Sequence, residues 1–474
     1  MSEGQSPGSV ELADNRSAST LLFDLVKGAV EHFPQGFAGF EIQGDAAAFR
    51  KTYSKLLPQF EAARLASAQR YEIASYLVDQ LNEQIVWQAD NKTQPLRQML
   101  QNPVAPLPLH KHDFAGSPGW RPGFVYRGQR WGAAQFGELA AQLVQRHVIT
   151  TAAGEALTWV GQDLLSDGAL NLQGRKIAVM GAGAEMAPTR LWLQAGADVL
   201  WLDTVPPPDD WLSDEGLAGR LYWPQRNVDL LRRPQEVLAT LAEFAGSDKL
   251  DLGLYAYAPG QAREMRLTST MNAIVDALDH GLVASVTTLV SPTTPTRLQQ
   301  SDLDVMADRL RQRPLWEALL GRAGLLGRGG GAAKSGACAA SLTVVPIQGA
   351  SYQVAQYVGK VLAAEVWAGG QTWRVSANTA AITRTRSLAH PVFTAAFGGA
   401  EALRVETLTP RQSRCINGLL ALHDWAAPEA PVPGAIRVHG AIHAVPYPLE
   451  SALRIAAAIG FARSPRLLRG LFAR

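Results

Sequence analysis

A short apolar segment that runs into a glycine turn is the feature that most restricts the fold of this chain. Residues 175–180 read Arg-Lys-Ile-Ala-Val-Met, and Gly181, Ala182 and Gly183 follow them. Glycine at 181 permits a tight turn at the end of a strand, and glycine at 183 lets a phosphate approach the backbone without a Cβ in the way. We expect a helix to follow the turn, through about residue 193, and to direct free N–H groups at the anion.

A second apolar segment, residues 197–203, ends in an acidic residue. Asp203 lies 22 positions after Gly181, where a carboxylate can accept hydrogen bonds from the adenosine ribose of a dinucleotide. The same charge repels a 2′-phosphate, so Asp203 favours NAD over NADP, and Arg190 or Arg226 could reverse that preference. We therefore predict NAD or NADP as the cofactor, bound at the glycine turn and at Asp203.

The turn departs from the usual dinucleotide pattern at one position. Met186 stands where the third glycine of G-x-G-x-x-G lets the helix and the strand pack closely. A bulky side chain at this position could displace the helix and occlude the pyrophosphate site. A glycine turn that only makes the fold therefore remains an alternative to a nucleotide site that includes Met186.

Short apolar strands alternate with helical patterns in the second half of the chain. This alternation predicts an α/β fold with a doubly wound, mainly parallel sheet. The expected later strands are residues 252–257, 283–290, 342–345 and 373–377, and the expected helices are 228–245, 262–279 and 351–367.

We predict four regions along the chain. Residues 1–18 are polar and rich in Ser and Gly, which favours disorder. Residues 19–168 have mainly helical periodicity and form an N-terminal helical domain, in which Pro58 should kink or divide the longest helix. Residues 169–448 form the sheet domain, and residues 292–340 interrupt it as a lid-like insertion.

The fourth region, residues 449–474, is a basic amphipathic C-terminal helical tail. Arginines alternate there with Leu, Ile and Phe, and Glu450 is its only acidic residue. Such a segment can lie on an anionic membrane surface as a peripheral contact. The alternative is a terminal helix docked on its own domain or on a partner subunit.

The composition narrows the classes of partner. A formal net charge of +2 over 474 residues provides no strong field for nucleic acid. Cys338 and Cys415 are too few for a disulfide scaffold and fit a reducing compartment. No apolar run approaches the ~20 residues that span a bilayer. With the two cysteines, this favours a cytoplasmic protein, and we expect a homo-oligomer that acts on a small molecule.

Gly440 argues against a helix that would align His439 and His443, so we expect no metal site.

The order of elements in residues 174–386 resembles the short-chain dehydrogenase/reductase family. The likeness implies a Rossmann-type fold, a nicotinamide cofactor that also contacts Ala258 and Gly260, and hydride transfer to or from a carbonyl or alcohol carbon. Three segments carry it: the turn after the fourth strand at 252–260, the fifth strand at 285–291 with its terminal Ser291, and the sixth strand with its substrate-side loop at 374–385.

The family's catalytic core is a serine with Tyr-x-x-x-Lys, and this chain departs from it. The expected spacing from Tyr352 reaches Gln356, and Tyr352 and Lys360 are eight residues apart, about 12 Å along an α-helix. Tyr357 and Lys360 are three apart and share one face of an α-helix. We therefore expect Tyr357 to be the acid/base and Lys360 its electrostatic partner, and an ordinary half-buried contact is the alternative. The predicted catalytic residues are Tyr357, Lys360, Ser291 and Tyr352, with Ser341 as an alternative to Ser291.

Three functions remain open at this point. The first is an NAD(P)-dependent oxidoreductase, a reductase or dehydrogenase, that acts on an apolar, lipid-like or polyketide-like substrate. The second is an S-adenosylmethionine-dependent methyltransferase, which also uses a glycine turn and an acidic residue at the end of the second strand. The third is a non-catalytic Rossmann-fold binding or scaffold protein, which the missing third glycine and the missing catalytic lysine favour.

Overall fold

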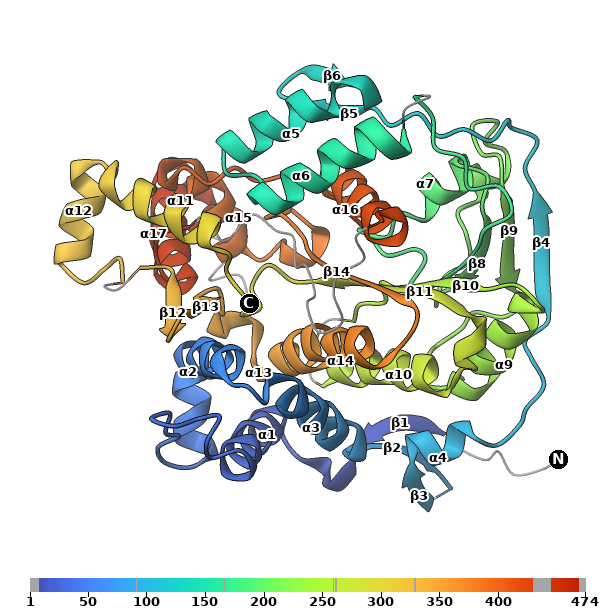
Figure 1. Ribbon diagram of the computed structural model, residues 1–474, viewed down its shortest axis with the longest axis horizontal. Coiled ribbons are helices and arrows are strands. Elements are labelled where there is room, and N and C mark those ends of the chain that lie inside the picture. The colour runs from blue at the N-terminus through green and yellow to red at the C-terminus, as the bar shows by residue number, and fades with distance from the viewer. Residues whose placement is uncertain are drawn as a thin grey trace.

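The computed structural model describes residues 8–90, 92–165, 168–258, 260, 262–327, 330–428 and 445–468. Within these residues, seven strands form one central sheet in the order β14-β11-β10-β7-β8-β9-β4 (Figure 1). Neighbouring strands are parallel except for β4, which pairs antiparallel with β9 at the edge. The α/β class and the mainly parallel sheet are thus confirmed. The strands are β4 (Leu109–Asp113), β7 (Lys176–Met180), β8 (Asp198–Leu202), β9 (Arg220–Pro224), β10 (Leu250–Leu254), β11 (Val283–Val290) and β14 (Arg374–Thr379).

The central strands are apolar on both faces because helices cover both faces. In β7, Ala178 and Met180 belong to one hydrophobic cluster, whereas Ile177 and Val179 belong to another. Every residue of β8 and β10 is buried. This pattern is typical of a parallel sheet enclosed between two layers of helices, in which strands read as continuous apolar runs.

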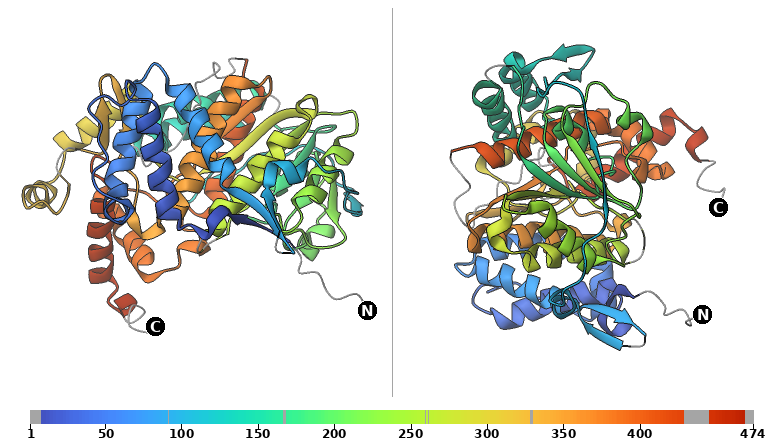
Figure 2. Two further views of the ribbon diagram at one scale, coloured as in Figure 1. Left: turned by 90° about the horizontal axis from the view of Figure 1, so that it is seen from below. Right: turned by 90° about the vertical axis from the view of Figure 1, so that its right-hand side faces the viewer.

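One face of the sheet carries α9, α10 and the helical segment around α14, and the other carries α7 and α16 with α5 and α6 beyond them (Figure 1). The right-hand view of Figure 2 shows the N-terminal helices (blue) and α5 and α6 (teal) on opposite sides of the sheet. The helices of these layers are α5 (Phe136–Gln145), α6 (Thr151–Trp159), α7 (Thr189–Gln194), α9 (Pro234–Ala245), α10 (Arg263–Ala277), α14 (Ala363–Gly370) and α16 (Pro410–Ala426).

The N-terminal helices form a further layer over α10 and α14. They are α1 (Ala18–His32), α2 (Ala46–Ala66) and α3 (Arg70–Glu83), and α2 runs unbroken through Pro58, which was expected to kink or divide it. A small antiparallel sheet joins them, formed by β1 (Ser9–Leu12), β2 (Ile85–Ala89) and β3 (Lys92–Pro95), and α4 (Leu96–Leu100) follows it.

The expectation of disorder over residues 1–18 is wrong for the strand that begins at Ser9, and residues 1–7 lie outside the described residues. Val10 is fully buried, and its N–H donates to the carbonyl of Leu231. The backbone of Ser9–Leu12 pairs with β2 and the Val10 side chain packs in the core, and these distant contacts are not visible in a local polar composition.

The insertion 292–340 contains two helices and a hairpin. They are α11 (Gln300–Arg311), α12 (Leu315–Arg322), β12 (Ala332–Ser335) and β13 (Cys338–Ser341). The strand expected at 342–345 is wrong: those residues form no strand, and β13 of the hairpin ends at Ser341, just before them. The helical pattern at 351–367 is divided into α13 (Ala350–Gln353), the π-helix η6 (Val354–Leu362) and α14.

At the C-terminal end, α17 (Leu449–Arg463) packs on α15 (Pro391–Gly399), which continues into the short helix η8 (Ala400–Leu403). A Cβ on Gly460 would lie 1.7 Å from the carbonyl oxygen of Ala395, so the two helices touch backbone to backbone. The tail is therefore a docked helix over residues 449–463, and residues 469–474 lie outside the described residues.

Candidate functional site

Two adjoining cavities lie beyond the carboxyl ends of the central strands. A polar cavity of about 700 Å³ borders the ends of β7, β8 and β10, and an apolar cavity of about 340 Å³ borders the ends of β11 and β14. The two share Ala184, Glu185, Tyr257 and Ser387 in their linings. From β7 the chain runs outward through β8 to β9, and then crosses back to β10 on the other side of β7. The strand order thus reverses beside β7, and ligands of open α/β sheets bind at such a point.

The glycine turn after β7 holds the backbone against the residues that follow β10, the neighbouring strand of the sheet. Gly181 has a φ of +85°, and a Cβ there would lie 2.2 Å from the backbone nitrogen of Ala256. Gly183 is exposed, and its N–H donates to the Asp203 carboxylate at 2.9 Å. Ala182 is buried, and its carbonyl accepts from the Thr189 hydroxyl. Gly181, Gly183 and Asp203 line the polar cavity, as the sequence predicts for a nucleotide site.

The helix expected directly after this turn begins six residues later than Gly183. Residues 181–188 form successive turns, and α7 starts at Thr189 and has only six residues. The N-terminus of α7 therefore does not point its N–H groups or its dipole at the glycine turn, contrary to the expectation from the sequence. Met186 lines the apolar cavity and is not part of the polar lining, so its bulk does not occupy the space beside Asp203.

Arginines provide the positive charge of the polar cavity. Arg232, Arg263, Arg266 and Arg386 line it from three separate places in the chain, since Arg263 and Arg266 both belong to α10. Arg266 forms an ion pair with Glu11 of β1 and donates to the carbonyl of Val10 at 3.2 Å. Sequence reasoning missed these arginines, because no local motif connects residues so far apart.

The turn after β10 contributes Ala258 to the polar cavity. Its N–H donates to Glu264 of α10 at 2.9 Å. Gly260 is exposed, has a φ of +94° and lies outside both linings. Tyr257, which was not predicted, lies at the junction of the two cavities, and its ring meets that of Tyr352 edge-on with 6.4 Å between the centroids.

Ser291 and Tyr352 meet in the wall of the apolar cavity. Ser291 follows the last residue of β11, and Tyr352 projects from α13. Burial raises the pKa of Tyr352 above its usual value, the nearby Glu264 charge raises it further, and a hydrogen bond with the Ser291 hydroxyl opposes the shift. Ser341, the alternative serine, is fully buried and hydrogen-bonds within the insertion, outside the lining.

Gln356 and Lys360 extend this wall from the π-helix. Gln356 accepts from the N–H of Ser291 at 2.9 Å and donates to Glu264 at 3.0 Å. Lys360 donates to the carbonyl of Leu289 at 3.0 Å, and its Nζ lies 3.9 Å from Glu264. Burial lowers the pKa of Lys360, and the Glu264 carboxylate opposes that shift. Gln356, which stands four residues after Tyr352 where the Tyr-x-x-x-Lys pattern has its lysine, therefore binds the backbone N–H of Ser291.

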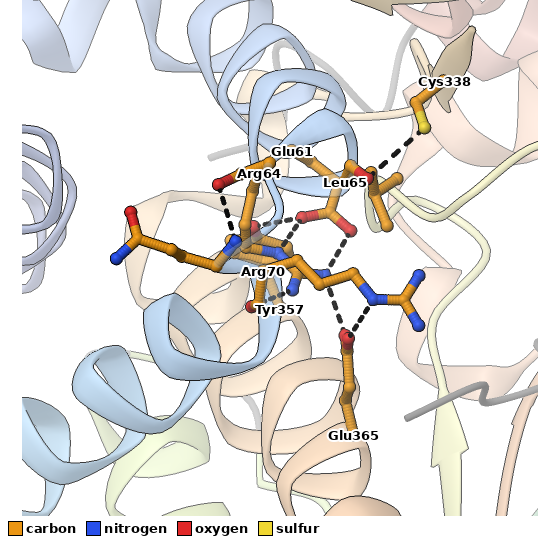
Figure 3. A network of polar contacts seen from close by, with 9 residues as sticks. Glu61, Arg64, Leu65, Arg70, Cys338, Tyr357 and Glu365 are labelled. Carbon is orange, nitrogen blue, oxygen red and sulfur yellow. Dashed lines mark hydrogen bonds and ion pairs between the residues drawn. The ribbon is translucent and has the colours of Figure 1, made fainter. Parts of the chain in front are cut away.

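Tyr357 lies away from the cavity, on the side of the π-helix that faces α2. Its hydroxyl donates to Glu61 at 2.5 Å, and the side chain is fully buried (Figure 3). The structure therefore does not bring Tyr357 to the wall that Lys360 lines. A π-helix closes hydrogen bonds from i to i+5, so each turn holds more residues than an α-helical turn, and the three-residue spacing no longer places two side chains on one face.

A scan against protein-family models and a search of curated proteins found no match for this chain. Among the described residues, no helix has the length and apolar content to cross a membrane. The described part of the chain also holds no group of three or more His, Cys, Asp or Glu side chains placed to bind a metal ion. His439 and His443 lie outside the described residues.

Proposed function

We propose that the protein is an NAD(P)-dependent oxidoreductase that reduces a carbonyl, or oxidises an alcohol, on an apolar substrate. The observation that carries this proposal is the junction of the two cavities, where a polar space for a dinucleotide adjoins an apolar space beside Ser291 and Tyr352. The order of the six parallel strands is the Rossmann order, with β7 as the first strand and β14 as the sixth. Asp203 directly follows the second strand, where dinucleotide sites of this kind place an acidic residue.

The lining of the polar cavity fits a dinucleotide in position. Asp203 lies where the adenosine ribose would bind, and the lining holds four arginines and four carboxylates, with ion pairs at Arg232–Asp229, Arg266–Glu11 and Arg386–Glu185. The arginines would hold the diphosphate in exchange for these carboxylates, since the short α7 does not supply that charge. When bound, the nicotinamide supplies or accepts the hydride. Asp203 also favours NAD over NADP, whereas Arg232 in the same lining would favour a 2′-phosphate.

Tyr352 is the residue we assign to proton transfer. Its side chain lines the apolar cavity beside Ser291, and its hydroxyl, like that of any tyrosine, is protonated at neutral pH, so it can donate a proton to a carbonyl oxygen during reduction. Burial and the Glu264 charge raise its pKa, which makes it a weaker acid than a free tyrosine. Ser291 orients that oxygen, and Gln356 fixes the backbone of Ser291. Lys360 places a buried positive charge behind them, next to Glu264.

The structure bears differently on the two other functions. A methyltransferase would gain support from an antiparallel strand at the β14 edge, but the antiparallel strand, β4, lies at the opposite edge. A binding protein without catalysis gains support from Gln356 and from the Gly183 N–H, which is already bonded to Asp203. The experiments therefore have to measure turnover of a substrate separately from binding of the dinucleotide.

Dinucleotide binding tests the cofactor assignment. NADH and NADPH should each be titrated into the protein in a calorimeter, and we expect NADH to bind more tightly. Arg232→Ala should weaken dinucleotide binding about fivefold, because one charged contact to phosphate is worth roughly 1 kcal/mol at a solvent-exposed site. Its neighbour Arg233, which lies outside the polar cavity, gives the matched control Arg233→Ala. Failure of both dinucleotides to bind at millimolar concentration would overturn the proposal.

Tyrosine substitutions test the proton donor. Tyr352→Phe should lower kcat about 100-fold or more and leave the Kd for NADH unchanged, because it removes only the proton that the carbonyl oxygen receives. Tyr357→Phe is the matched control on the other side of the π-helix, and it should lower stability with little effect on kcat. Equal losses of kcat in the two variants, measured on any ketone that the protein turns over, would contradict this assignment.

A further inference from the structure

Two helical segments, α15 with η8 and α17, form the wall of the apolar cavity away from Ser291 and Tyr352. Each turns an apolar face toward the cavity. From α15 and η8 the lining residues are Phe393, Ala396, Phe397 and Ala400, and from α17 they are Leu449, Ala452, Leu453 and Ala456. Both sets follow the spacing i, i+3, i+4, i+7, which is one continuous face of a helix. Each helix therefore offers a full apolar face to the cavity.

Small side chains keep this space open. Ala396, Ala400, Ala452 and Ala456 are each buried with no more than 8 % of their surface exposed. The helices cannot move closer to fill the space, because they already touch: a Cβ on Gly399 would lie 1.9 Å from the carbonyl oxygen of Ala456. The backbone contact thus fixes the separation of the two faces.

The charges in the lining are already paired. Glu185 accepts from the backbone N–H of Arg386 at 3.0 Å and lies 3.6 Å from its guanidinium. Lys360 is held by the carbonyl of Leu289 and by Glu264. No other charged side chain is in the described lining of this cavity. A carboxylate or phosphate on the ligand would therefore be desolvated without a free cation among the described lining residues to compensate it.

We infer that this cavity binds an uncharged, mainly hydrocarbon molecule with a carbonyl or hydroxyl oxygen at one end. The oxygen lies at the end lined by Ser291 and Tyr352, and the hydrocarbon body lies against the wall that α15 and α17 form together. The alanines on these two helices set the bulk that the cavity accepts. This inference rests on the proposed function for the identity of the oxygen group, and it adds the charge and shape of the substrate.

A pair of ligands of equal chain length tests the charge. Without any dinucleotide, 2-dodecanone should displace the uncharged dye Nile red from the protein, and dodecanoate should bind about tenfold more weakly or worse. Equal affinity for the ketone and the carboxylate would overturn the inference.

Substitutions on α17 test the position of the hydrocarbon body. Ala456→Phe should raise the Kd for 2-dodecanone about tenfold or more, since the ring fills space that several methylenes occupy. Ala462→Phe makes the same change at an exposed position of the same helix and should leave the Kd within about twofold. An unchanged Kd in Ala456→Phe would overturn the placement.

A variant that enlarges the cavity covers the case in which Ala456→Phe fails to fold. Phe397→Ala should shift the preference toward the bulkier cyclododecanone, relative to 2-dodecanone, by about threefold or more, and no shift would count against the helical wall. Calorimetry with NADH separates this inference from the proposed function. If the ketone binds and neither dinucleotide does, the inference stands and the oxidoreductase proposal fails; if NADH binds and the ketone does not, the reverse holds.

Discussion

Replacement of Arg64 by alanine is expected to lower the free energy of unfolding by about 3–5 kcal/mol, the cost of removing one partner from a buried ion pair. Arg64 is fully buried, and its guanidinium donates to Glu61 at 2.7 and 2.9 Å and to Glu365 at 2.8 Å (Figure 3). The variant would leave two carboxylates in the interior without their shared cation. Chemical denaturation followed by circular dichroism would measure the loss.

The stability lost in Arg64→Ala should also depend on pH, which gives a second test of the prediction. Burial raises the pKa of Glu61 in the folded protein, and loss of Arg64 raises it further, because that cation favours the charged form. A folded-state pKa above the unfolded value makes stability fall as the pH rises through that interval, so the loss in Arg64→Ala should shrink between pH 7 and pH 5. A loss that does not depend on pH would mean that packing, and not uncompensated charge, dominates.

Arg70 provides a matched control in the same network. Its Nε lies 3.8 Å from Glu365, and a third of its side chain is exposed. Arg70→Ala should therefore cost no more than about 1 kcal/mol, the usual upper value for a solvent-exposed ion pair. A similar loss in both variants would contradict the assignment of the energy to Arg64.

The second large effect is expected at the glycine turn. Gly181→Ala should destabilise the protein by about 2–5 kcal/mol, because it combines a side chain at positive φ with overpacking against the backbone. The added Cβ would meet the backbone of Ala256 at 2.2–2.3 Å, and no side-chain rotation relieves that contact. The displaced turn should also abolish dinucleotide binding, which calorimetry on folded protein at low temperature would measure.

A substitution at Gly174 separates the cost of a positive φ from the cost of the steric contact. Its φ of +82° is nearly that of Gly181 at +85°, but nothing lies within 4 Å of its Cβ position. Gly174→Ala should cost only about 1–2 kcal/mol, the conformational term alone, and should leave NADH binding intact. If the two variants unfold at the same denaturant concentration, the close approach to Ala256 contributes nothing.

The parts of the fold that local patterns determine could be predicted from the sequence. Residues 283–290 were expected as a strand and form β11 with those bounds. The β7 strand, the glycine turn and Asp203 were also found in the expected order, since an apolar run enclosed by helices and a glycine with positive φ are properties of short segments. The sheet class follows from their alternation with helices.

The faces of the helical segment that holds Tyr352, Tyr357 and Lys360 could not be predicted, because they depend on distant residues. Tyr357 bonds Glu61, which lies 296 positions away, and Lys360 meets Glu264. Neither contact leaves a local pattern, and the π-helical turns invalidate the three-residue spacing on which Tyr357 was chosen. One signal was present: Glu61 and Arg64 interrupt an otherwise apolar stripe, and charges inside such a stripe indicate a buried pair.

The antiparallel edge strand has a consequence for how the chain is made. The β4 residues 109–113 are synthesised more than 100 positions before residues 220–224 of β9, with which they pair in the central sheet. Emerging from the ribosome, this segment must wait until β7, β8 and β9 have been synthesised before its ladder can form, and strands of large sequence separation pair late. Until then its unpaired edge is open to other nascent chains, and a chaperone that holds residues 109–113 would shield it during that interval.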